Sequence, residues 1–385
     1  MTYRRTAIPA VAGGLLLTAL LWWAGASVHA LELPGTTRVL DGQTVAELRS
    51  WLLPWAYDPL GAARFGSAMV GGDAVGTDGA SYTALEATGQ QIRFGAVLVF
   101  FSSGALFLLR RLPPERGRMP AALLALWAWG LAAGTLAVTV SAPWWIASGG
   151  RGSFRFLPHL AGVIASGREV LVGTALVVAV ATVLVARLTV NGAGPLPREV
   201  VPTRAARLSA TVGTAVVAVA VLVVSRLSVA AALQSVSPSV GVLSEPGDLL
   251  RQWLLFGAWS GPGNAAFGAW LLDRGADVLL LVVVWWALRR LPGLLTRATV
   301  PAMAMGGVCA TVLGLLAGEL LRMVRGAVEL PGDPLRLLSG FAAGVPAALV
   351  WGLVAGVAAG VTLRVVRGRA EVAGAAPDGP EPTHP

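Results

Sequence analysis

The feature that most limits the fold is an internal duplication. The segment from Arg49 to Gly66 returns 202 residues later as the segment from Arg251 to Gly268, and both copies share Trp-Leu-Leu near the start and Phe-Gly at the end. Two further matches keep the same order: Leu-Arg-Arg-Leu-Pro at 109–113 and 288–292, and Gly-Leu-Ala-Ala-Gly at 130–134 against Gly-Leu-Leu-Ala-Gly at 314–318. We therefore predict two related halves, residues 1–195 and 196–369.

The composition places both halves in a membrane. Hydrophobic residues make up 55% of the 385 positions and charged residues only 13%, which is too little polar surface for a soluble globule. The net charge is +9, and every basic residue is Arg, but these arginines stand at the ends of apolar runs. Such placement is typical of membrane topology and not of nucleic-acid binding. We expect membrane lipids, and no nucleic acid, as partners.

The apolar runs predict an all-α integral membrane protein with eight transmembrane helices. A helix needs roughly 20 apolar residues to cross the hydrocarbon core. The predicted spans are residues 7–30, 94–109, 119–146, 170–186, 206–224, 267–288, 300–321 and 341–363. A cleaved signal peptide is the alternative for the first span, although its removal would leave the first half with three spans.

The charge distribution predicts the orientation. Arg110, Arg111, Arg289 and Arg290 stand in two short loops on the same side, which the positive-inside rule makes cytoplasmic. Both termini then lie in the cytoplasm, and the localisation is the cytoplasmic membrane. Because each half has four spans, the repeat is parallel and not inverted. Residues 370–385 lack periodicity and read as a disordered cytoplasmic tail.

The duplicated Trp-Leu-Leu segments are too short to cross a bilayer and predict interfacial helices on the outer side, with Trp55 among the tryptophans that suit the headgroup region. The first half also contains 23 residues that the second lacks, at about residues 71–91. This Gly/Asp-rich stretch predicts an outer loop with turns around one or two short strands. Asp73 and Asp78 are its candidate ligand-binding residues, but their spacing does not predict a metal site.

Small residues at every fourth position predict close helix packing. The last span contains Gly340, Gly344, Ala348, Gly352, Gly356 and Gly360, and the seventh contains Gly306, Ala310, Gly314 and Gly318. Such rows let helix backbones approach each other in lipid. We predict that these two rows face each other in a tight hairpin of the last two spans.

Charges inside the sixth span form the main candidate site. Asp277 stands twelve residues before Arg289, about 18 Å from the inner face at 1.5 Å per residue, and is thus still in the hydrocarbon. Asp273 and Arg274 lie one turn away, and we expect Glu319 and Arg226 at similar depth on neighbouring spans. Intramembrane charges often mark an ion or substrate path. A structural ion pair is the alternative reading.

Three functions remain open at this point. We favour a non-enzymatic protein with a ligand-binding or transport role at this outer polar site. A scaffold or accessory subunit, with a protein partner or a second copy of the chain, is the first alternative. An outer-facing enzyme for a lipid-linked substrate, using Asp41 or Glu47, is the second. With one cysteine, Cys309, and three histidines, the sequence predicts neither a metal nor a cofactor.

One stretch resembles a known family. Ser81 to Ala87 leads into an apolar span that ends in Leu109-Arg110-Arg111. Residues 60–112 are in this respect similar to the streptophobe family, very hydrophobic multi-pass proteins without an assigned biochemical role, although the first loop departs from the family pattern. The resemblance implies a bacterial cytoplasmic membrane and supplies no catalytic residue.

Overall fold

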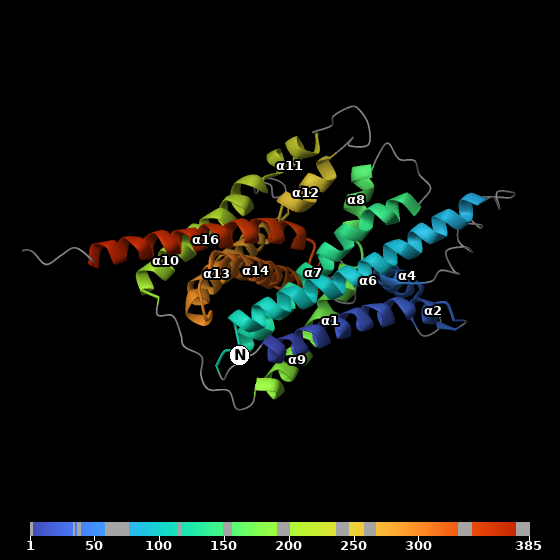
Figure 1. Ribbon diagram of the computed structural model, residues 1–385. Coiled ribbons are helices and arrows are strands. Elements are labelled where there is room, and N and C mark those ends of the chain that lie inside the picture. Colours follow the sequence, from blue (N-terminus) through green and yellow to red (C-terminus); the bar gives the residue numbers. More distant parts are fainter. Residues whose placement is uncertain are drawn as a thin grey trace, which may run out of the picture.

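The computed structural model describes residues 3–33, 35–36, 40–57, 77–113, 117–148, 156–190, 201–235, 246–257, 267–329 and 341–374. The regular elements in these ranges are helices (Figure 1). Their bounds are α1 (Tyr3–Ala26), α2 (Val28–Leu31), α4 (Gly42–Leu52), η1 (Leu53–Trp55), α6 (Thr77–Arg111), α7 (Met119–Ser148), α8 (Phe156–Ala165), α9 (Arg168–Val190), α10 (Thr203–Val219), the π-helical turn η2 (Ala220–Val224), α11 (Leu227–Gln234), α12 (Gly247–Leu254), α13 (Phe267–Leu294), α14 (Val300–Glu329) and α16 (Val345–Gly374).

Seven stretches of helix in the described residues are long and apolar enough to cross a membrane. They are Thr6–Leu31, Ala84–Arg111, Met119–Ser148, Arg168–Thr189, Thr203–Val224, Val300–Val324 and Val345–Gly368. The prediction of a multi-pass helical membrane protein is therefore confirmed. α13 is as long as these helices but is not one of the seven, because it is more charged. Every stretch of 18 residues within α13 contains Asp277 and at least two further charged residues.

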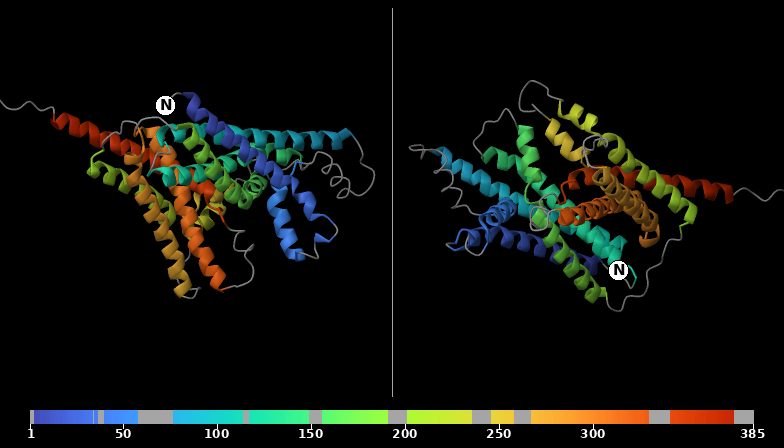
Figure 2. Two further views of the ribbon diagram at one scale, coloured as in Figure 1. Left: turned by 90° about the horizontal axis from the view of Figure 1, so that it is seen from below. Right: turned by 180° about the vertical axis from the view of Figure 1, so that it is seen from behind.

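The long helices pack in two groups of four. In the first, α6 packs on α1 and α7, and α9 also packs on α1 and α7. In the second, α13 packs on α10 and α14, and α16 also packs on α10 and α14. The groups lie side by side in Figure 1 and in both views of Figure 2. They meet mainly through α7 and α14, where the buried Cys309 thiol donates to the Ala125 carbonyl at 3.4 Å.

Within each group, successive long helices run in opposite directions, so the bundle has two distinct ends. One end is called the arginine end and is defined by Arg110, Arg111, Arg289 and Arg290. At this end the loop after α13 contacts the end of α6. There the Thr296 amide donates to the Arg111 carbonyl at 2.9 Å. The opposite end contains Trp55 and Trp145 and is called the tryptophan end below.

The glycine row of α16 packs on α14, and Gly340 of the predicted row lies outside the described residues. A Cβ at Gly352 would lie 2.7 Å from the Cα of Val308, and one at Gly360 would lie 3.2 Å from the Cα of Val300. Gly356 also faces α14, and Gly344, just before α16, faces the Leu315 side chain of α14. At Gly352 and Gly356 no side chain fits unless the opposite backbone moves.

The predicted partner row on α14 is wrong. A Cβ at Gly314 would meet the Leu280 carbonyl of α13 at 2.9 Å, and one at Gly318 would meet the Ala276 carbonyl at 3.0 Å. α14 lies between α13 and α16, so it carries small residues on two faces. Gly307, on the second of these faces, is the glycine that meets Gly352 and Gly356.

The predicted outer loop is also wrong where the structure describes it. α6 begins at Thr77, so residues 77–91 are helical and contain no strand. The sequence from 80 to 88 contains neither Gly nor Pro, and its Ala, Leu and Glu favour helix, which overrides the preceding turn signals. Asp78 consequently lies in the first turn of α6. Asp73 lies outside the described residues.

The last helix differs from its prediction at both ends. It begins at Val345 and not at residue 341, with Pro346 in the first turn, where proline is tolerated because the missing N–H has no partner there. It continues to Gly374, so the first five residues of the predicted tail are helical. The rest of that tail lies outside the described residues.

Candidate functional site

Asp277 lies between two arginines. Arg274 Nη1 is 2.6 Å from Asp277 Oδ2, and Arg322 Nη2 is 2.7 Å from Oδ1. Arg274 stands one turn earlier on α13, whereas Arg322 comes from α14. Asp277 is buried, with an exposed fraction of 8%. Each carboxylate oxygen has its own cation, so the arrangement neutralises Asp277 and connects the two helices.

Glu319 contacts the backbone before α16. Its Oε2 accepts a hydrogen bond from the Ala342 amide at 2.6 Å. Ala342 has φ +66°, in the left-handed region that residues other than glycine seldom adopt. The carboxylate of α14 therefore helps to hold a strained turn at the start of the last helix.

The other predicted site residues are spread over separate elements. Asp273 lies one turn before Asp277 on α13 and is half-buried. Arg226 is exposed and stands at the residue before α11, which packs mainly on η2 and α12. The structure thus brings Asp277 and Arg274 together and places Arg226 on an element that packs elsewhere.

A second charged group is buried at the tryptophan end. Arg93 of α6 has an exposed fraction of 1%. Its Nε donates to Ser141 Oγ at 2.9 Å, and its Nη1 donates to the Pro54 carbonyl. The guanidinium carbon lies 4.9 Å from the ring centroid of Trp145 and 5.8 Å from that of Trp55. Cation–π attraction and hydrogen bonds together stabilise the buried charge.

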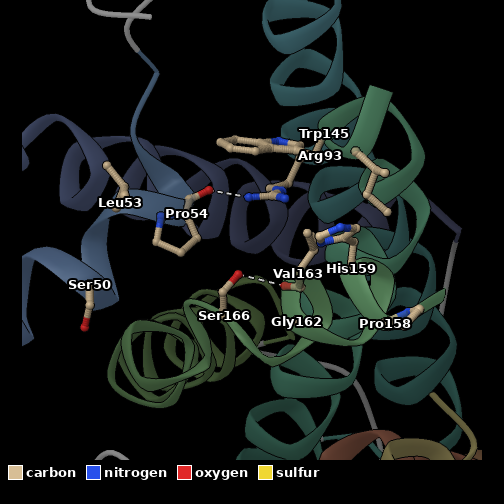
Figure 3. A pocket seen from close by; sticks show the side chains of 11 residues that line it. Ser50, Leu53, Pro54, Arg93, Trp145, Pro158, His159, Gly162, Val163 and Ser166 are labelled. Atoms are coloured by element: carbon tan, nitrogen blue, oxygen red, sulfur yellow. Dashed lines mark hydrogen bonds between the residues drawn. The ribbon is translucent and has the colours of Figure 1, made fainter. Parts of the chain in front are cut away.

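Arg93 lines a pocket of about 610 Å³ between η1, the end of α7 and α8. In Figure 3 the guanidinium lies between the Pro54 carbonyl and Trp145, and His159 approaches from α8. The lining residues are Ser50, Leu53, Pro54, Arg93, Trp145, Ile146, Pro158, His159, Gly162, Val163 and Ser166. Most of these side chains are apolar, and the volume suits a small organic molecule.

Trp55 lies behind the pocket, next to the lining residue Pro54. Its side chain is fully buried, and its indole N–H donates to the Gly167 carbonyl at 2.8 Å. Trp55 is therefore buried in the protein and does not face lipid headgroups, because η1 packs on α1. Gly167 has φ +70°, and a Cβ there would lie 2.6 Å from Trp55 Nε1, so this turn requires glycine.

Arg93 has no carboxylate partner among the described residues. Its partners are a hydroxyl, a carbonyl and two aromatic rings, all of them neutral. A buried cation without a counter-charge is costly, and the pocket leaves room for an anion beside it. In the part of the chain that the structure describes, no group of three or more His, Cys, Asp or Glu residues could hold a metal ion.

Comparison with protein-family models, curated proteins and solved structures found no match to this chain. No family is thereby identified, and the similarity to streptophobe proteins adds nothing to the site.

Two residues of these sites were missed from the sequence. Arg322 was missed because the register between α13 and α14 decides which arginine meets Asp277. Arg93 was missed because an arginine before an apolar run normally marks an interface. One signal could have suggested it: Arg93 precedes the second predicted span by a single residue, and tryptophans end the next span.

Proposed function

We propose that this multi-pass membrane protein is a binding protein whose ligand occupies the Arg93 pocket. One observation carries the proposal: a guanidinium that is 1% exposed, without a carboxylate among the described residues, lines a pocket of about 610 Å³. A ligand would supply the missing counter-charge and remain held by apolar walls. Transport is a further step that this observation does not require.

The Asp277 cluster has a different role in this proposal. A group on an ion path must exchange partners, whereas both oxygens of Asp277 lie within 2.7 Å of arginine nitrogens. This pairing supports a structural role, in which Arg274 and Arg322 allow a carboxylate to remain inside the bundle.

We also propose α13 as the eighth span. It has 28 residues, about 42 Å at 1.5 Å per residue, which exceeds the hydrocarbon thickness. Val278, Val282 and Trp286 are more than half exposed and lie four residues apart, so one face of α13 presents apolar side chains to lipid. Pairing of Asp277 with two arginines lowers the cost of its charge there.

The proposal includes a repeat of four spans in each half. It is supported by the packing, because α1, α6, α7 and α9 contact one another in the same order as α10, α13, α14 and α16. It is also supported by the burial pattern, because residues of α6 and α13 that are 179 positions apart in the sequence are both buried. The buried pairs are Val97 and Ala276, Phe101 and Leu280, Ala105 and Val284, and Leu109 and Leu288.

The arginine end is proposed as the cytoplasmic side, with both termini there, because short arginine-rich loops stay in the cytoplasm. The Arg93 pocket then opens toward the outer side of the membrane. Single cysteines placed on either side, in a Cys309→Ala background, test this orientation. Labelling of a cysteine in the loop between α6 and α7 by an impermeant reagent on intact cells would contradict it.

Native mass spectrometry of the full chain in mild detergent tests ligand binding. Gly162 lines the pocket, and a Cβ there would meet no atom within 4 Å, so Gly162→Leu fills space without displacing backbone. Gly173→Leu is the matched control, because its Cβ also meets nothing and it lies outside the pocket lining. We expect a bound molecule in the wild type and in Gly173→Leu, and its loss in Gly162→Leu.

Equal retention in the wild type and both variants would refute the pocket as the binding site. A retained protein subunit in place of a small molecule would favour the scaffold function.

A further inference from the structure

We infer that the ligand of this pocket is an amphiphile with an apolar body along the pocket wall and an oxyanionic head of net charge −1, held by Arg93. The inference rests on the proposed function and adds the chemical class of the ligand.

The charge of the pocket requires one negative group. Of the eleven lining residues, Arg93 alone carries a permanent charge, and His159 is the other basic side chain. The contacts of the guanidinium within the described chain are all neutral. One cation balances a monoanion, whereas a di- or triphosphate would bring several charges against a single arginine.

The free donors of Arg93 favour an oxyanion. A guanidinium has five N–H donors in a planar fork. Nε and Nη1 each donate one hydrogen bond to the protein, and Nη2 donates none to the described residues. Carboxylate and phosphate oxygens match this fork and form charge-assisted hydrogen bonds with it. Ser141 and the Pro54 carbonyl fix the orientation of the guanidinium before a ligand arrives.

The remaining lining favours an apolar body attached to that head. Leu53, Ile146, Pro158 and Val163 present hydrocarbon, and the Trp145 ring covers the guanidinium. The pocket lies next to the ends of the membrane-spanning stretches Met119–Ser148 and Arg168–Thr189, near the level where a lipid headgroup meets its acyl chains. An amphiphile can place its head on Arg93 there and leave its chain against the helices.

Two sources share this chemistry: a phospholipid whose head has a net charge of −1, and a free long-chain carboxylic acid. The experiment titrates the full chain in mild nonionic detergent with three probes and measures bound fractions by native mass spectrometry. The probes are dioleoylphosphatidylglycerol, dioleoylphosphatidylcholine and oleate. The first two share acyl chains and differ in net head charge.

We expect the wild type to bind the anionic lipid about tenfold or more tightly than the zwitterionic one, as one charge-assisted contact provides. Arg93→Gln should reduce this preference to about twofold or less. Arg251→Gln, which changes an exposed arginine at the same end, should retain it. If oleate binds at a lower concentration than dioleoylphosphatidylglycerol and displaces it, the natural ligand is the carboxylic acid. If the phospholipid binds at the lower concentration, the natural ligand is the phospholipid.

An unchanged preference in Arg93→Gln would overturn the inference. If Arg93→Gln does not fold, the wild type decides: equal affinity for the two lipids overturns it. Gly162→Leu separates this failure from failure of the proposed function. If the wild type binds both lipids equally and Gly162→Leu binds neither, the pocket is a binding site for a neutral ligand. Equal binding by Gly162→Leu and the wild type refutes the pocket itself.

Discussion

Replacing Gly356 by leucine tests how closely α14 and α16 pack. A Cβ at this position would lie 2.6 Å from the Cα of Ala304 and still closer to the Met303 carbonyl oxygen. Ordinary contact requires roughly 3.5–4 Å, so the backbones must separate by about 1 Å before a single carbon fits. The rest of the leucine side chain requires more. The obstacle is backbone on both sides, and it cannot be removed by a change of rotamer.

The expected change in the free energy of unfolding combines two opposing effects. Overpacking a close contact costs about 1–3 kcal/mol, and the upper end applies here because backbone must move. Leucine returns up to about 1 kcal/mol through its higher helix propensity than glycine. We expect a net loss of about 2 kcal/mol or more for Gly356→Leu.

Gly368→Leu is the matched control for Gly356→Leu. It lies on the same helix, is exposed, and would place its Cβ within 4 Å of no atom. The assay is thermal unfolding of the purified protein in one detergent, followed by near-ultraviolet circular dichroism. We expect Gly356→Leu to melt several degrees below the wild type and Gly368→Leu to melt at or above it. Equal melting temperatures in the two variants would refute this account of the α14–α16 contact.

Two further substitutions test the buried polar contacts. Asp277→Asn removes the carboxylate that Arg274 and Arg322 share and should destabilise the protein by about 2–4 kcal/mol, below the usual upper value because the Arg322 side chain is 36% exposed. A variant as stable as the wild type in detergent melting would exclude these ion pairs as a structural contact. Trp55→Phe removes the N–H that donates to Gly167 and should cost about 1–2 kcal/mol, with faster amide exchange at the start of α9. Unchanged exchange there would argue against that hydrogen bond.

The sequence predicted the membrane-spanning helices well because their cause is local. About 20 consecutive apolar residues suffice to define a span, and runs such as 119–146 and 300–321 fall inside α7 and α14. The start of α6 was missed for a related reason: turn signals near Asp73 and Asp78 were extended into a stretch that favours helix. Local patterns are least informative where one element gives way to the next.

The sites were harder to predict because they depend on register between helices. Asp277 was recognised from its depth in an apolar run, and its neighbour Arg274 from helical spacing. Arg322 comes from another helix, whose rotation against α13 no local pattern specifies. Arg93 required more still, since η1 must fold back across α6 before Pro54 can accept its hydrogen bond. Burial of that guanidinium is a tertiary property.

An experimental density map of the wild-type protein, purified with its native lipids, tests whether the Arg93 pocket holds a ligand. We expect non-protein density in contact with the Arg93 guanidinium, between Trp145 and His159, with an elongated part along Val163. An empty pocket, or a carboxylate of this chain in contact with Arg93, would contradict it.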